Sequence, residues 1–182
     1  MKKILFAGAL TLAALQMNAE ESKVIRISTD QTDLILKVGE NGRLYQTYLG
    51  EKLLHEADVN RFSWDIHAGS DGSISQRGWE VYSGSGNEDY FEPAVAITHN
   101  DGNTSTYLYY VSSSTSPVEG GTQTTINLRD DKYPVDVTLH YVAYPKENVI
   151  KTWSEIKHQE KKPIILSTYA STMLYFCRSS YY

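Results

Sequence analysis

An alternating pattern of residues between Val135 and Tyr144 constrains this chain more than any other feature. A period of two places neighbouring side chains on opposite faces of an extended strand, so the segment predicts a strand with one drier face. Leu34, Leu36 and Val38 form a shorter example, and no window after the N-terminal segment keeps a helical period. The sequence therefore predicts an all-β fold. The apolar positions of the longer run are Val135, Val137, Leu139, Tyr141 and Ala143.

Turn signals separate the strand-like runs at intervals that suit antiparallel pairing. Residues 39–42 and 100–103 contain Asn-Gly and Asp-Gly, which supply the positive φ that tight hairpins need. We interpret residues 112–121, rich in Ser, Thr and Gly, as a long hairpin loop. Residues 159–163 are expected to turn into a last strand-like run at 162–176. The pattern predicts a meander of strands, which indicates a sandwich or a large antiparallel sheet.

Residues 68–93 interrupt this rhythm. The segment is rich in Gly and Ser, contains Trp79, and ends in an acidic cluster of Glu88, Asp89 and Glu92. Loops this long without regular structure are more often functional or disordered than decorative. A retaining glycosidase needs two carboxyls about 5 to 5.5 Å apart, and adjacent loop carboxylates rarely achieve this with one of them desolvated. We therefore interpret the cluster as a solvated turn that leads into a strand.

Other residue patterns do not predict a catalytic or metal site. Asp65 and His67 would share one side of a strand, but no serine at a nucleophile elbow joins them. Residues 84–87 lack the lysine and the helix of a phosphate-binding loop. We therefore assign this chain no catalytic residue, no metal and no cofactor. The histidines show no short ligand spacing, and they are His55, His67, His99, His140 and His158.

The N-terminal residues have the features of an export signal. Lys2 and Lys3 precede an apolar run at residues 4–15, and Ala19 stands at a small-residue cleavage point. The run is shorter than the ~20 residues that span a bilayer, so we expect removal of residues 1–19 and no membrane anchoring afterwards. The expected location is periplasmic or secreted, in a bacterium. A net charge of −5 opposes nonspecific nucleic-acid binding, and the single cysteine, Cys177, allows no internal disulfide.

Six segments, taken in order and spacing, resemble the N-terminal domain of glycoside hydrolase family 36, the bacterial α-galactosidases. They lie at residues 34–38, 42–53, 90–95, 99–102, 136–141 and 149–156. Phe91 stands where many relatives have an arginine before Glu-Pro-Ala, which puts the subfamily in question. The resemblance implies a large β-sandwich, or supersandwich, over residues 20–176, ahead of a (β/α)₈ barrel whose two aspartates hydrolyse terminal α-galactosyl groups with retention. A barrel takes ~250 residues, more than this whole chain, so neither catalytic aspartate is expected here.

The resemblance also implies partners. α-Galactoside oligosaccharides would bind through the missing barrel, and the full-length parent would be a homo-oligomer. Loops of the sandwich border the sugar site in this interpretation, and Trp79 is our candidate carbohydrate-binding residue, set against a buried structural or subunit-contact role. Residues 177–182 form an atypical terminal tail that does not continue the family pattern. We therefore expect a truncated sandwich, that is, a fragment.

Two other classes of function stay open at this stage. One is a stand-alone periplasmic carbohydrate-binding β-sandwich with aromatic residues on an exposed face, and the other is an envelope structural or adhesin-like module. The fourteen tyrosines suit both sheet packing and sugar binding. The genomic sequence downstream of Tyr182 would discriminate, because a barrel-coding continuation supports the α-galactosidase fragment.

Overall fold

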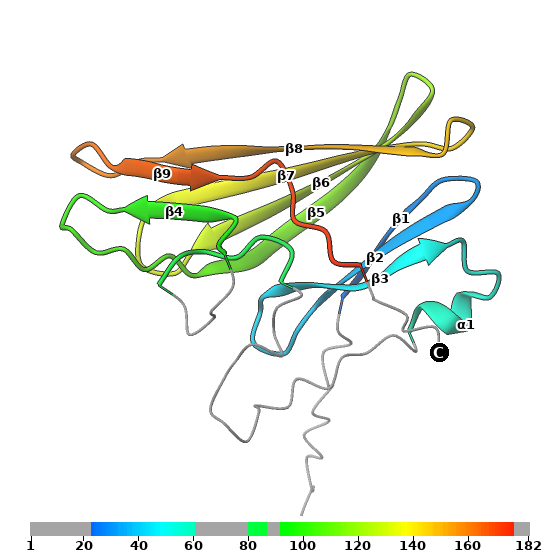
Figure 1. Cartoon of the computed structure of the whole chain (residues 1–182), viewed down its shortest axis with the longest axis horizontal. Coiled ribbons are helices and arrows are strands. Elements are labelled where there is room, and N and C mark those ends of the chain that lie inside the picture. Colours follow the sequence, from blue (N-terminus) through cyan, green and yellow to red (C-terminus); the bar gives the residue numbers. More distant parts are fainter. Residues whose placement is uncertain (1–22, 61–79, 87–91, 177–182) are drawn as a thin grey trace, which may run out of the picture.

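The computed structural model describes residues 23–60, 80–86 and 92–176, and antiparallel strands make up most of this part of the chain (Figure 1). The predicted all-β fold is confirmed. One short helix, α1 (Glu56–Val59), follows the third strand, and no helix in the described ranges is long and apolar enough to cross a membrane. The strands are β1 (Val24–Ser28), β2 (Thr32–Val38), β3 (Leu44–Glu51), β4 (Val95–Thr98), β5 (Leu108–Val118), β6 (Gly121–Asp130), β7 (Val135–Tyr144), β8 (Val149–His158) and β9 (Ile165–Tyr169).

Three sheets build the sandwich. Strands β1-β2-β3 and β5-β6-β7-β8 are meanders in chain order, as the turn spacing predicts, whereas the third sheet pairs β4 with the distant β9. In Figure 1 the four long strands form one layer, with the β4–β9 pair beside it and the β1–β3 sheet, blue to cyan, at the lower right. A single core of buried apolar residues joins all three sheets, so the two smaller sheets share the inner face of the larger one.

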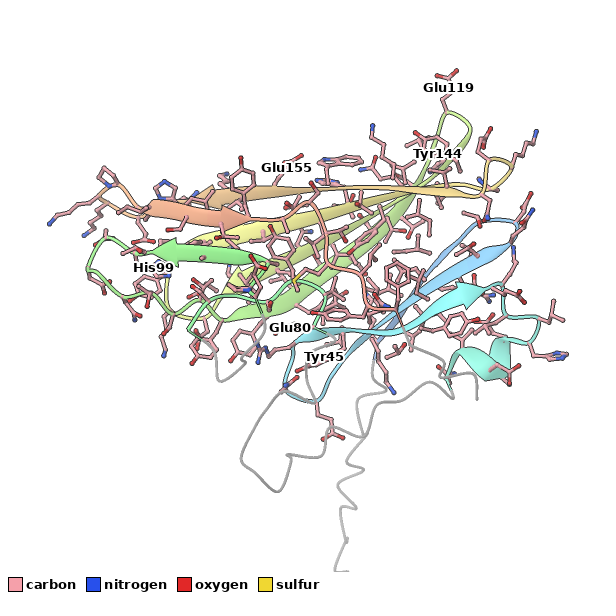
Figure 2. The ribbon with its side chains drawn as sticks, viewed as in Figure 1. Tyr45, Glu80, His99, Glu119, Tyr144 and Glu155 are labelled. Atoms are coloured by element: carbon pink, nitrogen blue, oxygen red, sulfur yellow. The ribbon has the colours of Figure 1, made fainter. Side chains whose placement is uncertain are left out.

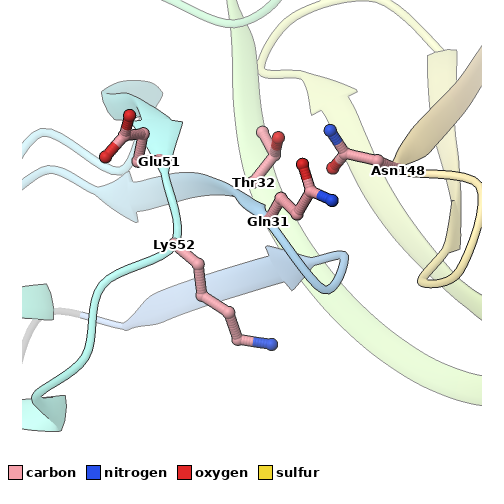
Figure 3. A pocket seen from close by; sticks show the side chains of 5 residues that line it. All are labelled: Gln31, Thr32, Glu51, Lys52 and Asn148. Atoms are coloured by element: carbon pink, nitrogen blue, oxygen red, sulfur yellow. The ribbon is translucent and has the colours of Figure 1, made fainter.

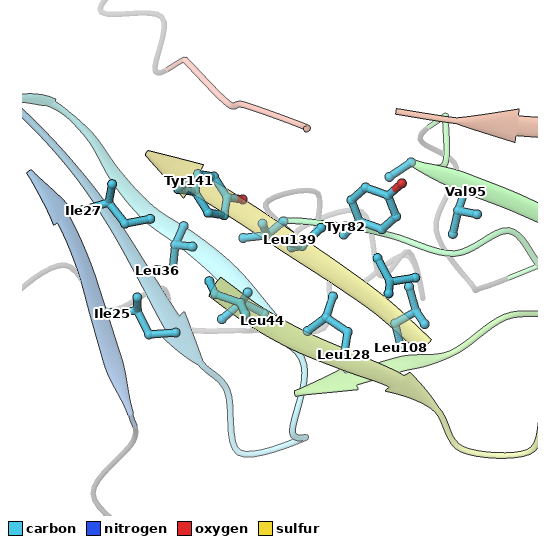
Figure 4. Close-up of a cluster of buried hydrophobic side chains, with 14 of the residues drawn as sticks. Ile25, Ile27, Leu36, Leu44, Tyr82, Val95, Leu108, Leu128, Leu139 and Tyr141 are labelled. Atoms are coloured by element: carbon cyan, nitrogen blue, oxygen red, sulfur yellow. The ribbon is translucent and has the colours of Figure 1, made fainter. Parts of the chain in front are cut away.

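The alternation in β7 sets the position of this core. Val137, Leu139 and Tyr141 are buried, while Thr138 and His140 lie on the opposite face. Burying side chains of this size contributes about 1.5–3 kcal/mol each. Figure 4 shows Leu139 and Tyr141 among core residues from all three sheets and from the segment before β4. Those labelled there are Ile25, Ile27, Leu36, Leu44, Tyr82, Val95, Leu108 and Leu128.

The predicted loop at residues 112–121 is wrong. Strand β5 continues to Val118, and the turn into β6 takes only Glu119 and Gly120, whose φ of 73° suits a residue without a Cβ. Along this hairpin, hydroxyl side chains face each other across the strands, as Thr115 and Thr124 do with Oγ1 atoms 3.5 Å apart. Cross-strand Thr and Ser pairs stabilise a sheet, and this stabilisation overrides a composition that is typical of loops.

Two other turns exist but connect different partners than expected. The 100–103 turn forms, with the His99 N–H donating to the Asn103 carbonyl, yet it joins β4 to β5, which lie in different sheets and make no hairpin. The 159–163 turn leads into β9, which pairs with β4 rather than with β8. Of the strand-like run at 162–176, only Ile165–Tyr169 is a strand. Pairing between β4 and β9 is nonlocal, so no local signal reveals it.

Candidate functional site

A polar pocket of about 420 Å³ opens where three chain segments meet at one end of the sandwich (Figure 3). Its lining comes from the β1–β2 turn, the end of β3 and the β7–β8 turn. The hydroxyl of Thr29 donates to Asn148 Oδ1 at 2.5 Å, and Lys52 Nζ donates to the Thr29 carbonyl at 2.8 Å. Asn148 has a φ of 53°, a conformation that asparagine tolerates in turns. The lining residues are Gln31, Thr32, Glu51, Lys52 and Asn148.

This pocket offers hydrogen bonds but no machinery for a reaction. Gln31, Glu51, Lys52 and Asn148 are all exposed, so their polar groups remain solvated. Glu51 is the single carboxylate in the lining, and acid–base or glycosidase chemistry needs a second group with a displaced pKa. The geometry therefore suits weak contact with a polar solute rather than catalysis.

A buried histidine, His99, directly follows the last residue of β4 (Figure 2). Its two ring nitrogens have partners of different kinds. His99 Nδ1 is 2.7 Å from Glu160 Oε1, and Nε2 is 3.2 Å from the hydroxyl of Thr106. The ring of Tyr133 stacks on the imidazole with centroids 3.6 Å apart. A hydroxyl, a histidine and a carboxylate in this order resemble a nucleophilic triad, but Thr106 is fully buried and no substrate can reach it.

The same cluster fixes three turns of the sandwich. Glu160 accepts hydrogen bonds from the backbone and side-chain nitrogens of Asn100, which ties the β8–β9 turn to the β4–β5 turn. Burial alone would raise the pKa of Glu160, but the hydrogen bonds from Asn100 and His99 outweigh burial and hold this pKa below its ordinary value. Tyr133, from the β6–β7 turn, donates its hydroxyl to Asp101 at 2.9 Å. The role of the cluster is structural.

A second histidine lies on the outer face of the four-stranded sheet. His140 stacks on Trp153 of β8 with ring centroids 4.6 Å apart, and Gln123 and Thr125 contact its Nδ1 at 3.2 and 3.4 Å. Glu155 lies on the same face, with Oε1 3.3 Å from His140 Nε2. These contacts come from both neighbouring strands, but the buried Nε2 makes no hydrogen bond within the described residues. The face combines one large aromatic ring with hydroxyl, amide and charged groups.

A buried ion pair connects Arg43, the residue before β3, to Glu80, the first described residue after the gap at 61–79. Arg43 Nε donates to Glu80 Oε1 at 2.9 Å, and Nη2 donates to Oε2, so the guanidinium holds the carboxylate in a two-pronged contact. The side chains are only 8% and 3% exposed. Burial opposes the charge on Arg43, yet the carboxylate of Glu80 keeps the pKa of Arg43 above its ordinary value. Nothing local in the sequence signals this pairing, because the residues are far apart.

The residues that sequence reasoning singled out are only partly within the described structure. Trp79, Glu88, Asp89, Asp65 and His67 lie outside the described residues, so their roles stay predictions. Cys177 and the export signal lie outside as well.

Glu92, the described member of the acidic cluster, is exposed, which agrees with a solvated turn. Within residues 23–60, 80–86 and 92–176, no three His, Cys, Asp or Glu side chains gather into a group that could hold a metal ion.

Comparison with protein families gives one match, and it covers most of the chain. The sequence model described as the glycosyl hydrolase family 36 N-terminal domain matches residues 42–182. A search of curated proteins finds no match.

Solved structures with a similar fold include two α-galactosidases of Geobacillus stearothermophilus and one of Lactobacillus brevis. AgaA superposes with a TM-score of 0.69 at 22% identity over 82% of this chain, and AgaB with 0.67 at 22% identity over 81%. The Lactobacillus brevis enzyme gives 0.67 at 17% identity over 84%. The chain spans only 24%, 23% and 24% of these proteins, respectively. At such identities the likeness establishes the sandwich fold.

Proposed function

Because this chain belongs to the glycosyl hydrolase family 36 N-terminal domain family, we propose that it is the non-catalytic β-sandwich portion of an exported α-galactosidase. The family match over residues 42–182 carries the proposal, and the sandwich fold supports it. Hydrolysis of terminal α-galactosyl groups belongs to a barrel of the parent protein. The sandwich positions that barrel, and α-galactoside oligosaccharides bind through it. One solved relative, a variant of AgaA, is in complex with raffinose.

Export rests on the N-terminal segment. Lys2 and Lys3, the apolar run at 4–15 and Ala19 have the order of a cleavable signal, and the mature protein is then periplasmic or secreted. The sandwich needs no disulfide in that compartment, because its stability comes from the apolar core.

The buried carboxylates support a non-catalytic role. Asp33 accepts hydrogen bonds from Arg26, Ser28 and the backbone N–H of Leu53. Burial raises the pKa of Asp33, but these donors outweigh burial and bring the pKa below its ordinary value. Glu160 is held in the same way by Asn100 and His99. A glycosidase acid needs a raised pKa, so neither group suits that role, and the donors that hold both groups are structural contacts within the sandwich.

An activity assay tests the proposal directly. The purified chain should not hydrolyse an aryl α-galactoside above the uncatalysed rate, while the product of the complete gene region should. The genomic sequence after Tyr182 is a second test. A continuation that encodes a barrel supports the proposal that this chain is part of an α-galactosidase. Turnover by the chain alone that disappears in Glu92→Ala, Glu88→Ala or Asp89→Ala would show that the acidic cluster is catalytic and that the proposal is wrong.

A second candidate function is a stand-alone carbohydrate-binding sandwich, and the outer face around Trp153 favours it. An aromatic ring beside amide and hydroxyl groups is the composition of many sugar sites, since the ring stacks on the sugar and the polar groups bind its hydroxyls. Calorimetric titration with raffinose distinguishes the two. Binding by the isolated chain that is lost in Trp153→Ala supports the second candidate, and absence of binding supports the first.

A further inference from the structure

The walls of the polar pocket at the end of the sandwich are fixed to one another by hydrogen bonds. Thr29, which is buried in the β1–β2 turn, donates its hydroxyl to Asn148 Oδ1 in the β7–β8 turn. Between the same two turns, the Asp30 N–H donates to the Pro145 carbonyl at 3.2 Å. Lys52, just after β3, donates from Nζ to the Thr29 carbonyl. Because three segments are held in this way, a ligand would meet a site that needs little ordering to bind it.

The pocket presents hydrogen-bond donors and acceptors side by side. Thr29 holds Asn148 through its side-chain oxygen, so both N–H groups of the Asn148 amide remain able to donate to a ligand. Gln31 adds two N–H donors and a carbonyl acceptor, and Thr32 adds a hydroxyl that can do both. Figure 3 shows the polar ends of these three lining side chains turned toward one another. Hydroxyl groups, which also donate and accept, complement such a surface.

The charge of the lining favours a neutral ligand. Glu51 carries one negative charge and Lys52 one positive charge, and the other three lining side chains are neutral. An anion would be repelled by the Glu51 carboxylate and a cation by the Lys52 ammonium group. The five described lining residues include no aromatic or aliphatic side chain, so an apolar ligand would gain no hydrophobic contact. A neutral ligand with several hydroxyl groups meets all of these conditions.

We propose that this pocket is a binding site for a neutral monosaccharide. Its volume of about 420 Å³ lies in the lower part of the range of roughly 300–1,000 Å³ for small-molecule sites, which suits one sugar ring better than an oligosaccharide. The described lining offers no aromatic ring for stacking, so binding is weak and rests on hydrogen bonds. The site goes beyond the proposed function, because it shares no residue with the outer face around Trp153 and does not involve the barrel.

Saturation-transfer NMR on the whole chain tests the site, because this method detects weak binding. The probe is galactose, a neutral hexose, and the zwitterion glycine is the comparison. Galactose should receive saturation from the unsubstituted chain, and glycine should not.

A double variant, Gln31→Glu with Asn148→Asp, removes the amide donors with little change in side-chain shape. The aspartate keeps an oxygen that accepts from Thr29, and it tolerates the φ of 53° at this position. The double variant should bind galactose at least about tenfold more weakly, which corresponds to about two lost hydrogen bonds. Gln159→Glu, at an exposed position just after β8, is the matched control for the added charge and should bind like the unsubstituted chain. Trp153→Ala should also bind normally.

Several results would overturn the proposal. These are a double variant that binds galactose as tightly as the unsubstituted chain, a signal that only Trp153→Ala removes, or galactose that receives no saturation at all. A glycine signal as strong as that of galactose would also contradict it, because the pocket would then not select a neutral ligand.

Thermal unfolding shows whether each variant folds. If the double variant does not fold, backbone amide shifts of the unsubstituted chain decide. Shifts at Gln31, Thr32 and Lys52 on addition of galactose support the pocket, and shifts confined to the strands around Trp153 refute it. The α-galactoside assay on the product of the complete gene region tests the proposed function separately, since galactose binding in this pocket requires no barrel.

Discussion

Removal of Arg43 should destabilise the fold strongly, because it takes away a buried two-pronged contact with the carboxylate of Glu80. The two side chains are 8% and 3% exposed and make a two-pronged contact. At an effective dielectric constant of about 20, unit charges about 4 Å apart attract by ~4 kcal/mol. Breaking a buried pair from one side costs about 3–5 kcal/mol. We expect Arg43→Met to lower the free energy of unfolding by an amount in this range.

A double-mutant cycle isolates the pair. Replacing both partners, as in Arg43→Met with Glu80→Leu, removes both charges of the pair, so the double variant should be more stable than Arg43→Met alone. Urea unfolding followed by circular dichroism gives the midpoint and the slope for each variant. The measurements are made at low protein concentration, so that any self-association does not contribute to the midpoint.

An exposed pair serves as the control for this cycle. Arg129 donates to Asp136 at 2.6 Å, but the Arg129 side chain is 63% exposed. Exposed ion pairs contribute little, so Arg129→Met should leave the urea midpoint almost unchanged. A loss of less than about 1 kcal/mol in Arg43→Met, or single-variant losses that simply add in the double variant, would refute the reasoning about burial.

Three further predictions concern pH, backbone contact and sugar binding. The pKa of Asp33 is lower in the folded than in the unfolded chain, so ionised Asp33 stabilises the fold above about pH 4 and this stabilisation disappears as the pH falls below that value. Melting temperatures measured from pH 3 to 7 should show the loss, and the Asp33→Asn variant should show a smaller one. Gly84→Ala should lower the free energy of unfolding by about 1–3 kcal/mol in urea, because its Cβ would lie 2.0 Å from the Thr106 carbonyl oxygen. The control is Gly102→Ala, whose Cβ meets nothing within 4 Å. Its free energy of unfolding should fall by only about 1–2 kcal/mol, because Gly102 has a positive φ. In the full-length parent, Trp79→Ala should raise KM with an unchanged melting temperature if the ring contacts sugar; a lower melting temperature with unchanged KM would exclude that role.

Local patterns were sufficient for some strands, but not for all of them and not for their partners. The alternation in β7 predicted both its extended conformation and its buried face, because a period of two acts within one strand. The Ser- and Thr-rich stretch of β5 reads as a loop in isolation and becomes a strand only through hydroxyl pairs with β6. The β4–β9 pairing was missed entirely, since it depends on two short segments that are distant in the chain.

The sequence by itself determined the class of fold and the family, because strand periodicity, turn residues and the order of six segments are all written along the chain. Only the tertiary structure decided which polar residues meet. His99 with Glu160 and Arg43 with Glu80 are pairs formed by folding, and each joins elements that no local pattern connects. The pairing of β4 with β9 was also decided at this level, because neighbours in a sheet need not be neighbours in sequence.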